Sequence, residues 1–209
     1  MRDPEDLWKH QPGNYFFLAT KSKTGKWRDH VIPRGEWELI DNIIDSHRSS
    51  DIYMCPHGFD FEEDQDQRRL RESSVDPMML NADLDEAEHR EIAIRTNIDI
   101  ESSPGRYVGY WLTDAPASES LNRRLAYSIG ADISGWDRTQ VLRVPGTKNY
   151  KYDPPAKVKL LWSDGPTYRV ARLEKMLPDA PAGSAIPEDS SDVRELYLNY
   201  EKHLTRWTR

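Results

Sequence analysis

The chain has 209 residues, of which 37% are hydrophobic and 31% charged, and its formal net charge is −7. This composition excludes a disordered chain, and no segment reaches the roughly 18 apolar residues of a membrane span. The single cysteine, Cys55, excludes an internal disulfide and a zinc site of four cysteines or of two cysteines with two histidines. Because the first residues also lack the apolar core of a signal peptide, we expect a cytoplasmic protein without a membrane partner.

Periodicity and turn residues predict strands and helices in mixed order along the chain. The predicted strands are 14–20, 27–33, 51–55, 78–85, 97–103, 106–113, the segment from 139 into the turn at Pro145 and Gly146, 156–162 and 167–173. The predicted helices are 36–47, 117–130, with Ser118 as its cap and Gly130 at its end, and 192–207. The mixed order favours an α+β fold over regular βαβ winding.

A change in composition after residue 178 predicts a boundary. We expect one domain over 1–178, followed over 179–209 by a linker and a C-terminal amphipathic helix. That helix either packs on its own domain, docks on a partner or begins a further domain.

The stretch "MMLNADLD" ends a buried-looking strand with two carboxylates, Asp83 and Asp85. Side chains at i and i+2 of a strand share a face, so the two acids lie on one side and Leu80, Ala82 and Leu84 on the other. Two adjacent carboxylates resist ionisation unless a cation compensates them, and Mg²⁺ is commonly bound by one or two carboxylates together with substrate phosphates. A strand that simply ends in solvent is the alternative.

Two later stretches carry compatible chemistry. A tight turn at Ser103, Pro104 and Gly105 is followed by Arg106, and backbone amides there could approach phosphates. The stretch "GWDRTQVLRVPGTKNYK" supplies Asp137 and Arg143, and Asp132 competes with Asp137 as a third carboxylate. Read singly, these are an ordinary hairpin turn, a turn residue and a surface arginine.

Basic residues gather in three places despite the negative net charge. The groups are Lys21, Lys23, Lys26 and Arg28; Arg68, Arg69 and Arg71; and Arg143, Lys148 and Lys151. They are either solvated loops or contacts to nucleic acid. Trp27 and Tyr53 either belong to the core or stack a base.

In this order, "ADLDEA", "SSPGRYVGYW" and "DRTQVLRVPGTKN" resemble the three motifs of the archaeo-eukaryotic primase superfamily, over roughly residues 14–170. The likeness is to primase-polymerase domains of phage and plasmid replication proteins, and "LRVPGTKN" is its most specific part. The resemblance implies a small α/β unit packed on an RRM-like antiparallel sheet, with the acidic residues in the cleft between them.

The resemblance also implies residue roles. Asp83, Asp85 and Asp137 would be the catalytic ligands of Mg²⁺ or Mn²⁺. The residues expected to bind nucleotide are Ser103, Gly105, Arg106, Arg143, Lys148 and Asn149. When the second motif is aligned by Tyr110 and Trp111, the usual histidine falls on Val108, and we expect Arg106 and backbone amides to replace it.

The expected function is template-directed nucleotidyl transfer from nucleoside triphosphates on single-stranded DNA in phage or plasmid replication. The host cytoplasm would be its compartment if a phage encodes it, and a helicase domain or protein is a further expected partner. The alternatives are a non-catalytic nucleic-acid-binding module of a replication initiator, which Val108 favours, and a metal-dependent nuclease. The nuclease lacks a general base near the cluster and leaves "LRVPGTKN" unexplained.

Overall fold

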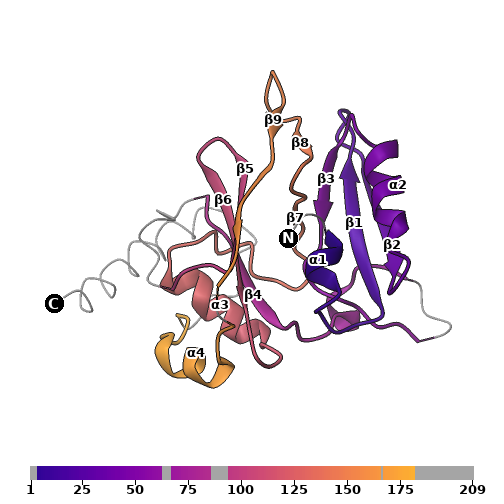
Figure 1. The fold of residues 1–209 in the computed structure, drawn as a ribbon. Coiled ribbons are helices and arrows are strands. Elements are labelled where there is room, and N and C mark those ends of the chain that lie inside the picture. Colours follow the sequence, from indigo (N-terminus) through magenta and orange to yellow (C-terminus); the bar gives the residue numbers. More distant parts are fainter. Residues whose placement is uncertain (1–3, 63–66, 86–93, 166, 182–209) are drawn as a thin grey trace.

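The computed structural model describes residues 4–62, 67–85, 94–165 and 167–181, which form two antiparallel four-stranded sheets with helices on their faces (Figure 1). The first sheet has the strand order β2-β1-β3-β7. Its elements are α1 (Pro4–Trp8), β1 (Tyr15–Lys21), β2 (Trp27–Pro33), α2 (Glu38–Ser46), β3 (Asp51–Met54) and β7 (Leu142–Arg143). The predicted α+β fold is confirmed, with the first strands and the helix of α2 close to their expected ranges.

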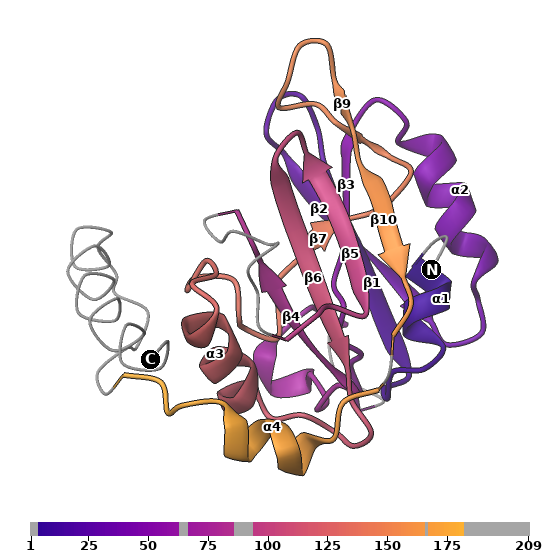
Figure 2. The same ribbon diagram turned by 60° about the vertical axis from the view of Figure 1, so that its left-hand side comes forward.

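The second sheet has the order β10-β5-β6-β4, and Figure 2 shows these strands side by side, with α3 beside β4 and α4 below them. Its elements are β4 (Met79–Asp83), β5 (Ile98–Ser103), β6 (Arg106–Leu112), α3 (Glu119–Ser128), β10 (Lys159–Ser163) and α4 (Val170–Met176). A short hairpin of β8 (Lys148–Asn149) and β9 (Ala156–Lys157) and a 3-10 turn at Arg71–Ser73 complete the elements of the described chain.

The two faces of the second sheet bury different side chains. Leu80, Ala82 and Leu84 join Trp111 in an apolar cluster that includes the buried face of α3. Met79 and Tyr110, on the opposite face, belong to the cluster that also contains the core of the first sheet. The alternation predicted for residues 78–85 is therefore present, and it turns Asp83 toward the first sheet.

Helix α3 begins as the sequence predicts. The Ser118 hydroxyl oxygen accepts a hydrogen bond from the Leu121 backbone N–H at 3.2 Å, and Gly130 after the helix has a φ of +66°. Leu121 and Leu125 are buried against β4. A side-chain cap of this kind contributes about 1 kcal/mol to helix stability.

The prediction of a strand at 167–173 is wrong, because α4 begins at Val170. The Asp114 carboxylate accepts a hydrogen bond from the Val170 N–H at 3.0 Å, which satisfies one of the amides left unpaired at a helix N-terminus. Leu173, three residues later, is buried in the cluster under α3. The strand propensity of the β-branched and aromatic residues in this segment is thus outweighed by the hydrogen bond from Asp114 and by the packing of Leu173.

The C-terminal helix predicted at 192–207 lies outside the described residues. The strand predicted from residue 139 shortens to the two residues of β7, and Gly146 turns the chain with a φ of +84°. None of the described helices has the length and apolar content needed to cross a membrane.

Gly58 gives a test of the packing that joins the N-terminal segment to β1. A Cβ built on Gly58 would lie 2.0 Å from the Pro12 carbonyl oxygen, whereas one on Gly135 meets nothing closer than 3.4 Å. We expect Gly58→Ala to lower the free energy of unfolding by about 3 kcal/mol, the upper range for overpacking, and Gly135→Ala to have a much smaller effect. Urea denaturation would measure both, and equal midpoints would contradict the described packing.

Candidate nucleotide and metal site

A pocket of about 240 Å³ is lined by residues from both sheets, close to the end of β4. Two sequence-predicted acids and four sequence-predicted nucleotide-binding residues lie in its wall. The lining consists of Tyr53, Asp83, Asp85, Ser102, Ser103, Arg106, Val108, Val141, Leu142, Arg143, Asn149, Lys151 and Tyr152. Residues far apart in the sequence are therefore brought to one cavity.

Asp83 and Asp85 form the acidic side of the pocket. Asp83 is the last residue of β4 and lies opposite Val108 of β6, while Asp85 follows two positions later. The Asp83 carboxylate accepts a hydrogen bond from the Asp85 backbone N–H at 3.1 Å. The pair is therefore held by a strand end and a local turn, with the two carboxylates exposed to the same cavity.

The pKa of Asp83 is raised to about 7. Burial is the largest cause, because it penalises the charged form, and the neighbouring Asp85 and the charge of Asp132 raise the pKa further. A divalent cation would remove this penalty. Two hard carboxylate ligands on one face are a donor set that fits Mg²⁺ or Mn²⁺, provided that other oxygens complete the coordination.

Cationic side chains supply the opposite charge in the same cavity. Arg106 donates from Nη1 to the Asp85 carbonyl oxygen at 2.7 Å and lies 3.6 Å from an Asp85 carboxylate oxygen. Arg143 is paired with Asp51 at 2.6 Å, and Lys151 lines the pocket beside it. Acids and cations in one cavity can hold a metal and a phosphate chain together.

Hydrogen bonds fix the wall between these charges. The Tyr152 hydroxyl lies 3.2 Å from the Ser103 Oγ, and the Asn149 side-chain amide donates to the Ser102 carbonyl oxygen at 3.2 Å. Asn149 also accepts from the Lys151 backbone N–H at 3.1 Å, so its amide already has a structural role. Of the predicted nucleotide-binding residues, Gly105 and Lys148 are not in the pocket lining, although Gly105 forms the expected turn with a φ of +75°.

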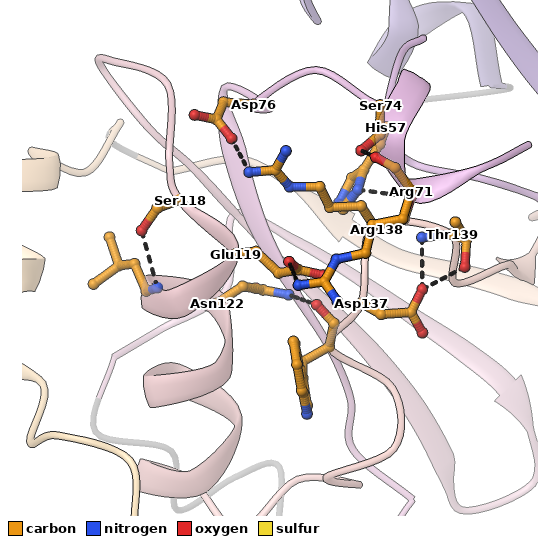
Figure 3. Close-up of polar contacts among 12 residues, drawn as sticks. His57, Arg71, Ser74, Asp76, Ser118, Glu119, Asn122, Asp137, Arg138 and Thr139 are labelled. Atoms are coloured by element: carbon orange, nitrogen blue, oxygen red, sulfur yellow. Dashed lines mark hydrogen bonds and ion pairs between the residues drawn. The ribbon is translucent and has the colours of Figure 1, made fainter. Parts of the chain in front are cut away.

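Asp137, the third predicted carboxylate, does not line the pocket. Its Oδ1 accepts hydrogen bonds from the Thr139 backbone N–H at 2.6 Å and from the Thr139 hydroxyl at 2.5 Å, as Figure 3 shows. The Asp132 carboxylate likewise accepts a hydrogen bond from the Ser134 backbone N–H at 2.8 Å. The backbone N–H of Asp132 donates to the Asp83 carbonyl oxygen at 2.9 Å. Within the described parts of the chain, no three His, Cys, Asp or Glu side chains are grouped so that they could hold a metal ion.

Three side chains contact backbone carbonyls of the loop that carries Asp137, and Figure 3 shows two of them, Asn122 and His57. Asn122 of α3 donates to the Trp136 carbonyl at 3.0 Å, Arg69 donates to the Thr139 carbonyl, and His57 Nδ1 lies 3.1 Å from the Arg138 carbonyl. Burial lowers the pKa of His57, and its Nε2 lies 3.1 Å from Asn81 Oδ1, so both ring nitrogens make contacts inside the protein. His57 therefore has a structural role in holding this loop.

Sequence reasoning missed several lining residues. Lys151 belongs to one of the basic groups, but no sequence pattern places it in the site, and Tyr152 and Ser102 carry no sequence signal. Val108, on which the motif alignment places a histidine of the resembled family, is buried between Asp83 and Ile100 across neighbouring strands. An apolar side chain there adds to the desolvation of Asp83.

Comparison with solved structures shows the fold. The AEP domain of the primase-polymerase of cyanophage S-2L matches with a TM-score of 0.60 and 12% identity, over 79% of this chain and 90% of that one. A structure of primase RepB′ matches with a TM-score of 0.58 and 17% identity, over 99% of this chain and 68% of that one. The catalytic domain of primase RepB′ in complex with initiator DNA matches with a TM-score of 0.55 and 18% identity, over 99% and 97%.

The chain therefore has the fold of archaeo-eukaryotic primase domains, as the motifs led us to expect. No family model and no curated protein matches the sequence itself.

The raised pKa of Asp83 predicts a cost in stability for the metal-free protein. The unfolded chain has an aspartate pKa near 4, so the folded state binds this proton more tightly and the free energy of unfolding falls as pH rises from about 4 to about 7. Asp83→Asn keeps the shape and removes the charge. We expect it to raise the Tm at pH 8 in EDTA and to leave the Tm nearly unchanged at pH 4.5.

Thermal melts followed by circular dichroism would measure this effect. Asp45→Asn on α2 is a matched control, because the Asp45 side chain is exposed and forms an ion pair with the exposed Arg48. A Tm for Asp83→Asn at or below that of the wild type at pH 8 would contradict the description of Asp83 as a destabilising charge.

Proposed function

We propose that this chain is a divalent-metal-dependent primase-polymerase, which joins nucleotides to a growing strand on a single-stranded DNA template. The observation that carries the proposal is the cavity itself: Asp83 and Asp85 lie in one wall, and Arg106, Arg143 and Lys151 lie in the same cavity. The shared fold of primase domains supports the same assignment. Replication of a phage or plasmid is the proposed setting.

The reaction class follows from this charge arrangement. In nucleotidyl transfer a 3′-hydroxyl oxygen bonds to the α-phosphorus of a nucleoside triphosphate, the bond to pyrophosphate breaks, and the hydroxyl proton is released. Little covalent chemistry is asked of the protein, so positioning and charge stabilisation carry the rate. A bound Mg²⁺ or Mn²⁺ ion would neutralise phosphate charge and orient the reacting oxygens.

The chain's own residues divide these tasks. Asp83 and Asp85 would hold the metal, with phosphate oxygens completing its coordination, and Asp137 stays a predicted third ligand. Arg106 is oriented by its hydrogen bond to the Asp85 carbonyl, which directs its guanidinium into the cavity where a phosphate chain would lie. Ser103 and Lys151 would provide further donors, in place of the histidine that Val108 replaces.

A second candidate function is a non-catalytic nucleic-acid-binding module of a replication initiator. Val108 and the position of Asp137 favour it, since both remove groups that the catalytic motifs of the family contain. Primer synthesis and primer extension, tested separately with Mg²⁺ and Mn²⁺ on unprimed and primed single-stranded DNA, would separate the two functions. Incorporation with either metal supports the enzyme, whereas DNA binding without incorporation supports the module.

The carboxylate pair gives the most direct mutational test. We expect the double variant Asp83→Ala, Asp85→Ala to lose nucleotide incorporation while it keeps the wild-type circular dichroism spectrum, because the substitutions remove two repelling charges and no core side chain. The control is Asp41→Ala, Asp45→Ala on α2, which should incorporate nucleotides at the wild-type rate. Incorporation by the first variant at the control rate would remove the pair from the active site.

Arg106 tests the phosphate side of the cavity. Loss of one hydrogen bond to a charged group costs roughly 1.5–3 kcal/mol, so we expect Arg106→Ala to raise the KM for nucleotide about tenfold to a hundredfold. Arg106→Lys should retain part of the affinity. The control is Arg48→Ala, which removes an exposed arginine paired with Asp45 of α2 and should retain the full affinity. An unchanged KM for Arg106→Ala would count against its contact with phosphate.

A further inference from the structure

Four side chains form a continuous aromatic and cationic row on one face of the first sheet. Lys21 Nζ lies 5.2 Å from the centre of the Trp27 ring, and the Trp27 and Tyr53 rings are 4.9 Å apart at 40°. The Arg143 guanidinium lies 4.7 Å from the centre of the Tyr53 ring. We refer to Lys21, Trp27, Tyr53 and Arg143 as the aromatic row.

Strand register explains why these residues meet. Lys21 is opposite Trp27, and Tyr53 is opposite both Ala19 and Arg143, so all of them lie on the sheet face away from Leu18 and Met54. Ala19 lies on β1, between the strands that carry the two rings. Its small side chain leaves room for the Trp27 and Tyr53 rings to contact each other across β1.

Trp27 is exposed in a way that core packing does not require. Its exposed fraction is 46%, whereas Trp8 and Trp111 are fully buried at 0%. Tyr53, beside it, is half-buried and lines the nucleotide pocket together with Arg143. The row therefore leads from the wall of the pocket out to an accessible indole, and the interpretation of Trp27 as a core residue does not hold.

Charge along this face suits a polyanion. Its acidic side chains are already compensated, since Asp51 pairs with Arg143 and Asp29 pairs with Arg69 at 3.2 Å. The hairpin between β1 and β2 adds the exposed Lys23 and Lys26, and the Lys23 Nζ lies 5.7 Å from the centre of the Tyr150 ring. A positive strip next to an exposed aromatic ring is the usual arrangement for binding single-stranded nucleic acid, whose unpaired bases can stack.

We propose that Trp27 is a stacking platform for an unpaired base of the template strand, with Lys21 and Lys23 beside the phosphates of that strand. This inference rests on the proposed function and extends its template site to the first sheet. The Tyr53 ring contacts the indole and also lines the pocket. A template base stacked on Trp27 would therefore lie next to the site of nucleotide addition.

Binding of a fluorescent oligo(dT) strand of about 15 nucleotides, measured by anisotropy in EDTA without nucleotide, tests this proposal. Stacking on one aromatic ring is worth enough that Trp27→Ala should raise the Kd about tenfold, while Trp27→Phe should retain most of the affinity. Leu161→Ala is the matched control, because Leu161 is 41% exposed on β10 and should leave the Kd unchanged. Circular dichroism would confirm that each variant is folded.

Two further measurements separate stacking from charge. The slope of log Kd against log salt concentration should be the same in Trp27→Ala as in the wild type. Lys23→Ala should reduce that slope by about one, because one phosphate contact is lost. A blunt duplex offers no unpaired base, so its affinity should be the same for Trp27→Ala and the wild type.

The outcomes distinguish this inference from the proposed function. If the wild type and Trp27→Ala bind oligo(dT) equally well, the stacking platform is excluded and the proposed function stands. The same conclusion holds if Trp27→Ala weakens binding of the blunt duplex as much as it weakens binding of oligo(dT). If the wild type does not bind oligo(dT) at all, both the platform and the proposed DNA template are excluded.

Discussion

The candidate site is organised around one electrostatic conflict, the proximity of two carboxylates at the end of a largely buried strand. Asp83 and Asp85 share a cavity, and burial together with their mutual repulsion raises the pKa of Asp83 to about 7. A fold gains no stability from such a pair in the absence of a cation. In the proposed function, a metal ion bound to a triphosphate would bring positive charge to this pair and negative charge to Arg106, Arg143 and Lys151.

The two sheets have different tasks around this pair. The second sheet buries Leu80 and Ala82 against α3 and thereby fixes the direction in which Asp83 points. The first sheet contributes Tyr53 and Arg143 to the lining of the same pocket and extends away from it to Trp27. In the proposed function, chemistry and template binding would thus lie on different sheets that meet at one cavity.

Sequence reasoning succeeded where the signal is local. The i, i+2 spacing of Asp83 and Asp85 predicts their common face, and Ser118 caps its helix as expected. It did not succeed where distant contacts decide, as at α4, whose first amide is capped by Asp114 from another part of the chain. For the same reason the sequence could not place Asp137, since its carboxylate bonds to Thr139 in a loop held by Asn122 and His57.

Diffraction from crystals grown with Mn²⁺ and a non-hydrolysable nucleoside triphosphate analogue would test the central claim most directly. The account predicts an anomalous peak within ligand distance of carboxylate oxygens from both Asp83 and Asp85, with triphosphate oxygens beside the ion and Arg106 on the phosphates. An ion bound by Asp132 or Asp137 away from that pair, or a triphosphate in the cavity with no ion at Asp83 and Asp85, would contradict it.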